Sequence, residues 1–196
     1  MEHPSYFTTL KKLLGNVEIV ERSGSIQVYD GVDIIFSLVS KANHYSIQIS
    51  ERGTVSTFCK IHEPKLAQLY FATFVKNALA DVELPLMSKL EGLAEDTDTL
   101  QHLFNQEGLA PYYSIDSIEA QRINLSTAPK RLYYVDASDT EYDITYLPNR
   151  FNQIFYSSVV NLRNRLEWLT ELADYPDDIQ KYEATLLGFS SEGIIK

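Results

Sequence analysis

The chain has 196 residues, of which 44% are apolar and 22% are charged, and this composition is typical of a globular protein with a substantial core. Its formal net charge is −10, its longest apolar runs fall short of the roughly 18 residues that a membrane-spanning helix needs, and its single cysteine cannot form an internal disulfide. These features exclude a membrane-spanning helix and a disulfide scaffold, and the first residues lack a secretory pattern, so we expect a cytoplasmic protein.

Local signals divide the first 40 residues clearly. Ser5 can cap a helix that Gly15 ends, and the apolar residues between them share one face of that helix. Turns at Ser23-Gly24 and Asp30-Gly31 separate the stretches that follow. We therefore expect a helix over residues 6–14 and strands over residues 17–22, 25–30 and 34–39. The last of these strands is almost wholly apolar, which is typical of a central strand.

A hairpin followed by a helix dominates the middle of the first half. Residues 45–50 alternate apolar and polar side chains, Gly53 can adopt the positive φ of a turn, and residues 55–61 fit the returning strand. Pro64 suits the first turn of a helix, because its missing N–H would have no partner there. The apolar residues that follow predict a helix over residues 64–81, which would cover the sheet.

The pattern weakens after residue 81 and then becomes regular again. Strand-like stretches occur at residues 121–125, 132–135 and 142–146, after short helices expected over residues 87–94 and 98–106. An apolar stripe from Phe151 to Leu169 has helical spacing and predicts a long amphipathic helix. A last helix is expected over residues 177–187, followed by a fraying tail.

Both halves of the chain thus run from a short helix through antiparallel strands to a long helix. This order predicts an α+β fold, with antiparallel β-meanders that are each covered by a long helix. The two halves, residues 1–82 and 83–196, would form a pseudo-repeat of structure, packed together as one compact unit, although their residues are not similar to one another.

Charge separates the two halves. Residues 1–82 carry eight basic and eight acidic side chains, whereas residues 83–196 carry nine basic and nineteen acidic ones. An acidic half argues against nucleic-acid binding, which needs clustered Lys and Arg, and it favours a basic protein partner. The alternative is that the acidity serves only solubility.

Motifs for catalysis or for a cofactor are missing from the sequence. It has neither a G-x-G phosphate loop nor a G-x-S-x-G nucleophile turn, and we expect no cofactor. The histidines His3, His44, His62 and His102 are too scattered to form a metal site. Cys59 lies between apolar residues of a strand and is expected to be a small buried hydrophobe.

Several carboxylates lie in stretches expected to be loops or helix starts. They admit three interpretations: solvated loops, a surface that binds a partner, or paired acids for catalysis. The candidate partner-binding residues are Glu95, Asp96, Asp98, Asp136, Asp139 and Glu141.

The stretch from Tyr45 to Phe71 carries a family resemblance. Tyr45-Ser-Ile-Gln-Ile-Ser-Glu-Arg-Gly-Thr54, continuing to Lys65-Leu-Ala-Gln-Leu-Tyr-Phe71, resembles a pattern of bacterial toxin-immunity proteins. The family is that of the immunity factor of the tuberculosis necrotizing toxin, which is an NAD-hydrolysing enzyme. The resemblance implies a small cytoplasmic protein that binds and blocks a cognate toxin, without assigning functional residues.

From the sequence we expect a non-enzymatic immunity protein that occludes the active site of a cognate toxin. Its acidic side chains would pair with basic groups of the toxin cleft, which would belong to an NAD-hydrolysing enzyme if the resemblance extends to the partner. We expect neither a nucleic acid nor a membrane as partner. The alternatives are a non-enzymatic ligand-binding or adaptor module and an enzyme of an unrecognised family.

Overall fold

The computed structural model describes residues 5–31, 33–91, 93, 96–172 and 176–196. The chain forms two compact units: unit 1 contains Met1–Ala80 and Trp168–Lys196, and unit 2 contains Asp81–Glu167. Residues 168–196 therefore belong to unit 1, whereas the charge pattern grouped them with the acidic half. Among the helices that the structure describes, none combines the length and apolar character needed to cross a bilayer.

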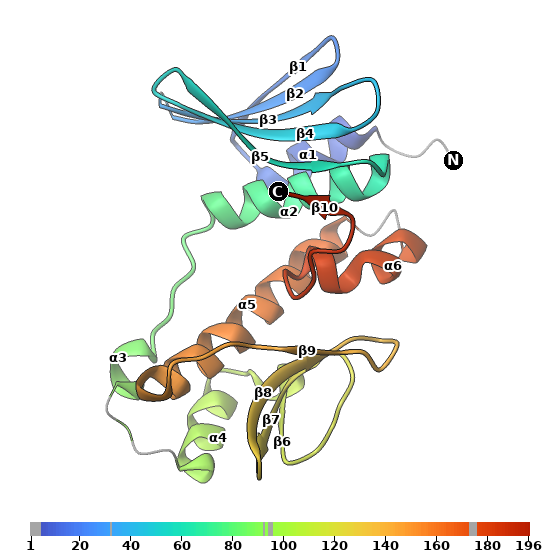
Figure 1. Cartoon of the computed structure of the whole chain (residues 1–196). Coiled ribbons are helices and arrows are strands. Elements are labelled where there is room, and N and C mark those ends of the chain that lie inside the picture. The colour runs from blue at the N-terminus through green and yellow to red at the C-terminus, as the bar shows by residue number, and fades with distance from the viewer. Residues whose placement is uncertain (1–4, 32, 92, 94–95, 173–175) are drawn as a thin grey trace. The chain divides into compact units, whose positions relative to one another are not determined.

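Unit 1 is built on a six-stranded sheet (Figure 1). The strand order is β1-β2-β3-β4-β5-β10, and every neighbouring pair is antiparallel. Its elements are α1 (Tyr6–Leu14), β1 (Glu18–Arg22), β2 (Ser25–Asp30), β3 (Ile34–Ser40), β4 (Tyr45–Glu51), β5 (Thr54–Ile61), α2 (Pro64–Leu79), α6 (Pro176–Leu186) and β10 (Ile194–Ile195).

The local signals of the sequence act in unit 1 as expected. The Ser5 hydroxyl accepts a hydrogen bond from the Thr8 N–H at 3.3 Å and caps α1, which Gly15 ends with a φ of 69°. The β4–β5 turn consists of Arg52 and Gly53, with φ values of 49° and 82°. Two consecutive positive φ values are typical of a type I′ hairpin turn. The predicted meander is therefore confirmed.

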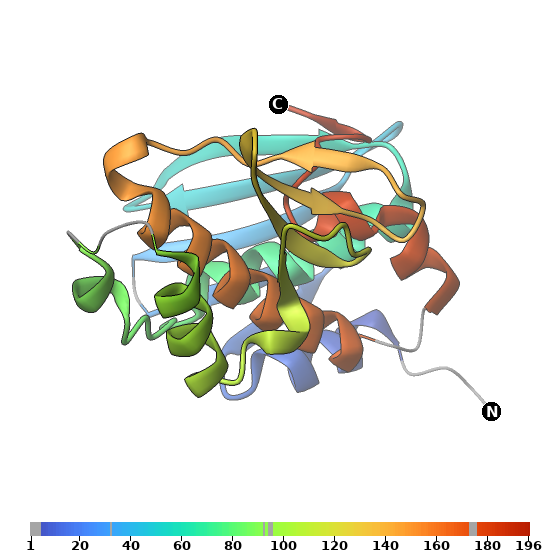
Figure 2. The same cartoon turned by 90° about the horizontal axis from the view of Figure 1, so that it is seen from below.

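Helix α2 covers one face of this sheet and contacts β3, β4 and β5. Pro64 lies in its first turn, and the Glu63 carboxylate accepts a hydrogen bond from the Leu66 N–H at 3.1 Å. Figures 1 and 2 both show α1 and α2 on the same side of the sheet. The face between sheet and helices holds the core, whose fully buried members include Leu10, Leu13, Val28, Ile47, Ile61, Leu66 and Phe71.

The C-terminal residues form a strand where the sequence analysis expected a fraying tail. In β10, Ile194 pairs with Ile61 and Ile195 pairs with Lys60 of β5. Gly193 precedes the strand with a φ of 77°, and a Cβ at this position would lie 2.7 Å from Cδ2 of Leu66. The two β-branched residues favour extended backbone, and the glycine allows the close turn that brings them to the sheet.

Unit 2 contains a four-stranded sheet in the order β6-β7-β8-β9. Its elements are α3 (Met87–Leu90), α4 (Thr97–Gln106), η1 (Ala110–Tyr112), β6 (Tyr113–Ile115), β7 (Arg122–Thr127), β8 (Lys130–Val135), β9 (Glu141–Asp143), η2 (Pro148–Arg150) and the part of α5 (Phe151–Glu171) up to Glu167. The α+β class is thus confirmed. This second sheet is not a plain meander, because β6 and β7 are parallel.

Aromatic side chains form the core of unit 2. The Phe104 ring of α4 lies 5.0 Å from the Phe155 ring and 5.5 Å from the Tyr156 ring, measured between centroids. The Tyr113 ring of β6 packs edge-on against both phenylalanines, at 5.4 and 5.9 Å. The Tyr113 hydroxyl donates to Oδ1 of Asn105 at 2.9 Å, so its polar end is satisfied. This cluster joins α4, β6 and α5.

Candidate functional site

The connection between β6 and β7 is the most unusual feature of unit 2. Residues 116–121 join two parallel strands, although a parallel connection normally needs a dozen residues or more. Asp116 and Gln121, at the two ends of this β6–β7 loop, have φ values of 54° and 61°. Such values are unfavourable for residues other than glycine, so the loop must be held by strong local contacts.

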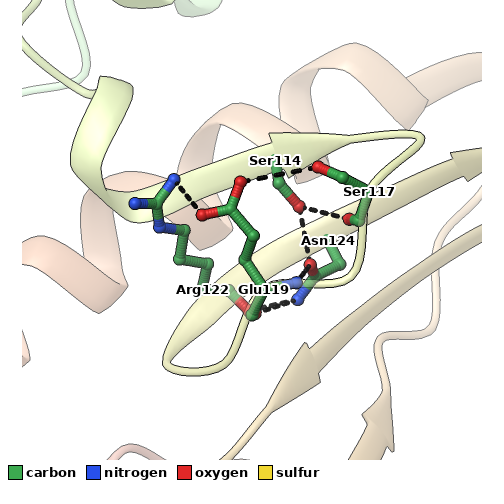
Figure 3. Close-up of polar contacts among 5 residues, drawn as sticks. All are labelled: Ser114, Ser117, Glu119, Arg122 and Asn124. Atoms are coloured by element: carbon green, nitrogen blue, oxygen red, sulfur yellow. Dashed lines mark hydrogen bonds and ion pairs between the residues drawn. The ribbon is translucent and has the colours of Figure 1, made fainter.

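Asn124 supplies these contacts from the neighbouring strand (Figure 3). Its side chain is fully buried; Oδ1 accepts from the Ser114 hydroxyl at 2.6 Å and from the Glu119 N–H at 2.8 Å. Nδ2 donates to the carbonyl oxygens of Glu119 at 3.0 Å and Arg122 at 2.8 Å. These four bonds use the full hydrogen-bonding capacity of an asparagine side chain. The role of Asn124 is therefore to fix the loop backbone.

Further contacts tie down the rest of the β6–β7 loop. The Ser114 hydroxyl shares its one proton between Oδ1 of Asn124 and the Ser117 carbonyl, which lies at 2.7 Å (Figure 3). The Asp116 carboxylate accepts from the Thr127 N–H and from the Thr127 hydroxyl, both at 2.8 Å, and these bonds lower the pKa of Asp116. Glu119 and Arg122 form a half-exposed ion pair at 2.6 Å.

Ile118 lies in this fixed loop and is 69% exposed, the largest exposure among the large apolar residues that the structure describes. A rigid loop that presents an apolar side chain loses little conformational entropy when it binds a partner. The β6–β7 loop therefore has the properties of a contact surface. This role has no signal in the amino-acid sequence, because Ile118 and Asn124 fit the strand-like pattern around them.

The β8–β9 loop, residues 136–140, is fixed in a similar way by Asp136. Its carboxylate accepts from the Ser138 hydroxyl at 2.7 Å, from the N–H groups of Ser138 at 2.8 Å and Thr140 at 2.9 Å, and from the Tyr142 hydroxyl at 3.0 Å. Desolvation raises the pKa of Asp136, but these hydrogen bonds outweigh it and the pKa is lowered. Asp136 is thus committed to loop structure.

The β6–β7 loop runs back along β7, from Asp116 beside Thr127 to Gln121, and its last residues lie at the end of the sheet where the β8–β9 loop begins. Arg122 at the start of β7 pairs with Val135 at the end of β8, and the Gln121 N–H donates to the Val135 carbonyl at 2.6 Å. The β6–β7 loop ends, and the β8–β9 loop begins, at this pair. Asp139, in the second loop, has a φ of 62°, and its exposed carboxylate has no partner among the residues that the structure describes.

The predicted partner-binding carboxylates separate into different roles. The Asp96 carboxylate caps α4 by accepting hydrogen bonds from the Thr99 hydroxyl and the Thr99 N–H. The bond from the Thr99 hydroxyl is the main cause of the lowered pKa of Asp96. Glu141 and Asp143 both form ion pairs with the Arg131 guanidinium. These contacts raise the pKa of Arg131, and the hydrogen bond to Asp143 has the larger effect. Three of the six carboxylates, at positions 96, 136 and 141, are therefore engaged within unit 2.

Asp98 and Asp139 are the predicted carboxylates that stay available. Asp98 is exposed in the first turn of α4, and like Asp139 it has no side-chain partner among the described residues. Glu95 lies outside the residues that the structure describes. The structure therefore does not bring the six candidates into one cluster of free acids.

Candidate metal ligands and the single cysteine are further groups that could be reactive. Within the described parts of the chain, no group of three or more His, Cys, Asp or Glu side chains is placed to hold a metal ion. Cys59 is 1% exposed, and burial raises its pKa to about 11. A thiol with this pKa is protonated at neutral pH and is a poor nucleophile.

A small cavity of about 140 Å³ lies at the start of α5 in unit 2. It is lined by Leu90, Leu93, Arg150 and Asn152, among others. Asn152 is 5% exposed; its Nδ2 donates to the Leu93 carbonyl at 3.0 Å, and its Oδ1 has no partner among the described residues. The lining of the cavity is thus partly polar, while Oδ1 of Asn152 itself is inaccessible to solvent.

Comparisons of the chain with protein-family models, with curated protein sequences and with solved structures found no match.

Proposed function

We propose that the chain is a non-enzymatic immunity protein, acting in the cytoplasm, that binds a cognate toxin and occludes its active site. The observation that supports this proposal most directly is the pair of fixed loops in unit 2, the β6–β7 loop and the β8–β9 loop. One loop presents the exposed Ile118, and the other presents the Asp139 carboxylate, which has no partner among the described residues. A few anchor side chains usually carry most of the binding energy of an interface, and Ile118 is the candidate anchor here.

The charge of unit 2 suits a basic partner. Residues 81–167 contain fourteen acidic and seven basic side chains, a formal charge of −7, whereas unit 1 carries the remaining −3. An enzyme that binds an anionic substrate such as NAD has basic groups around its active site. An acidic surface attracts such a cleft at long range and speeds association, an effect that salt weakens.

Pre-organisation adds to this charge. The hydrogen bonds of Asn124 and Asp136 fix the backbone of both loops before any partner binds. Binding then requires no further ordering of the loops, and this smaller loss of entropy lowers the dissociation constant. The resemblance of the Tyr45–Phe71 stretch to an immunity family supports a toxin as the partner, and the NAD-hydrolysing class is the first to test.

Co-expression tests the proposal. The open reading frame adjacent to this one on its source chromosome is expressed in bacteria alone and together with this chain, and surviving cells are counted. We expect the neighbour to be toxic alone, survival to be restored by co-expression, and the two proteins to elute as one complex from gel filtration. A harmless neighbour, or a toxic one that this chain does not neutralise, would contradict the proposal.

A second candidate function, a small-ligand-binding module, is favoured by the cavity of about 140 Å³ at the start of α5, whose lining includes Arg150 and the amides of Asn149, Asn152 and Gln153. Arg150 favours a negatively charged ligand, and amide side chains can bond to its hydroxyl groups. Small hydroxycarboxylates combine both features. A ligand-dependent rise in the midpoint of thermal unfolding, abolished by Asn152→Leu, would support this function; unchanged midpoints across a hydroxycarboxylate panel would exclude it.

A further inference from the structure

The outer edge of β5 is open along most of its length. β5 pairs with β4 on one side, while on its other side β10 pairs only with Lys60 and Ile61 (Figure 1). Residues 54–59 therefore have no neighbouring strand at this edge among the residues that the structure describes. Residues 54–58 are all exposed.

The turn geometry shows which backbone groups point outward at this edge. In a two-residue type I′ hairpin, the residues that flank the turn form a hydrogen-bonded pair, and hydrogen-bonded and non-hydrogen-bonded pairs then alternate. Glu51 and Thr54 flank the turn, so Val55 is the first residue whose N–H and C=O point away from β4, and Thr57 is the second. These groups form the backbone template that an added strand requires.

Apolar side chains accompany this template. Val55 is 61% exposed and Phe58 is 39% exposed. The register between β4 and β5 shifts at Ile47/Gln48, and Phe58 is the extra residue of this bulge. The Phe58 ring stacks on Phe74 of α2, with centroids 4.5 Å apart and an interplanar angle of 28°. An aromatic pair thus lies next to the free backbone groups.

Charge and length limit what can occupy this edge. The side chains of residues 54–59 are uncharged, which favours an uncharged segment beside them, and Lys196 after β10 acts electrostatically on Cys59 at the far end of this stretch. At about 3.3 Å per residue, these six residues offer roughly 20 Å of edge. This length suits a short extended segment better than a second sheet, because a stable dimer needs roughly 1,000 Å² of buried surface.

A second copy of the chain fits poorly. Two copies use all the outward-pointing groups only if Val55 of each copy pairs with Thr57 of the other in an antiparallel register. That register places Arg52 of one copy opposite Lys60 of the other. Ile195 already occupies that position beside Lys60. A separate peptide has no residue that corresponds to Arg52 and can end before β10, so it does not compete with Ile195 for the position beside Lys60.

We propose that the free edge of β5 binds an extended, uncharged segment of a partner protein by antiparallel strand addition, in line with β10. The segment bonds to the N–H and C=O groups of Val55 and Thr57, and it directs an aliphatic or aromatic side chain against the Phe58–Phe74 pair. Strand addition of this kind draws affinity from the backbone and specificity from alternate side chains. The site lies in unit 1 and does not depend on the acidic loops of unit 2.

The test uses a phage-displayed library of random octapeptides, selected on the full chain. We expect selected peptides to be uncharged and rich in β-branched and aromatic residues. One selected peptide is then synthesised and titrated against the wild type, Val55→Pro and Val55→Thr. Val55→Pro removes the outward N–H without breaking the ladder to β4, and should weaken binding about tenfold, whereas Val55→Thr keeps the N–H and should bind as the wild type does.

Amide hydrogen exchange of the wild type with this peptide gives a second readout that needs no variant. Bound peptide should slow exchange at Val55 and Thr57, and should leave the exposed amides of unit 2 unchanged. No enriched peptide, equal affinity for Val55→Pro, or protection elsewhere would overturn the proposal. A concentration-dependent dimer that Val55→Pro abolishes would assign the edge to a second copy and would overturn it as well.

Discussion

The two units of this chain reach their folds by different means. In unit 1 the strands β1 to β5 form consecutive antiparallel hairpins, and turns such as the one at Gly53 have a local cause. In unit 2 a six-residue connection joins parallel strands, and it is held by Asn124, which lies beyond the loop in the chain. Local turn chemistry thus gives unit 1 its order, whereas unit 2 depends on a buried polar network that forms only with the fold.

Both units should depend to a similar extent on a buried phenylalanine in their core. Phe104→Ala in unit 2 and Phe71→Ala in unit 1 each remove a fully buried ring. Each should lower the free energy of unfolding by about 3–5 kcal/mol, measured by urea denaturation. A loss below about 1 kcal/mol at either position would show that the corresponding core is not packed as described.

Asn124→Ala should show the difference between the units. The change removes four hydrogen bonds and leaves loop N–H and C=O groups unsatisfied, so the free energy of unfolding should fall by about 3 kcal/mol. The control is Asn161→Ala, an exposed asparagine on α5 whose loss should change stability by less than about 0.5 kcal/mol. Equal effects of both variants would contradict the role given to Asn124.

A substitution in the β4–β5 turn of unit 1 should lower the free energy of unfolding less than Asn124→Ala does. Gly53→Ala places a Cβ in open space, but its φ of 82° is strained for alanine, so the cost should be about 1 kcal/mol. Gly53→Asn should cost less, because asparagine tolerates positive φ better. Chemical denaturation measures both variants, and a larger loss for the asparagine variant would contradict the turn assignment.

Acid should weaken the β8–β9 loop. The pKa of Asp136 is lower in the folded chain than in the unfolded chain, so its ionised form stabilises the fold above the unfolded pKa of about 4. This contribution is lost as the pH falls through the lower, folded pKa. Asp136→Asn should therefore flatten the dependence of the free energy of unfolding on pH below about 4. The exposed Asp30→Asn serves as the control, and identical slopes for the two variants would contradict this account.

Much of unit 1 could be predicted from sequence because its signals are local. The cap at Ser5, the turn at Gly53 and the alternation around Ile47 each act within a few residues. The parallel pair β6–β7 could not be predicted, because a six-residue connection predicts a hairpin. β10 was also missed, since two isoleucines after Gly193 carry no strand pattern of their own.

The partner-binding role of the acidic residues stays a prediction. Of the six candidates, Asp98 and Asp139 are free among the described residues, whereas Asp96, Asp136 and Glu141 are engaged within unit 2. Whether a given carboxylate is free depends on its neighbours in space, such as Arg131 beside Glu141 or Tyr142 beside Asp136. A sequence pattern alone does not contain these partners. Ile118 becomes notable only once Asn124 is seen to fix the loop that carries it.

The central claim is that unit 2 binds a basic protein toxin. The most direct test measures the dissociation constant of the purified complex with the product of the adjacent reading frame. Asp98→Lys with Asp139→Lys should weaken binding by about tenfold or more, while Glu18→Lys with Asp30→Lys, the same charge change in unit 1, should have little effect. Equal affinities for the two double variants, or a larger loss from the unit 1 pair, would contradict the claim.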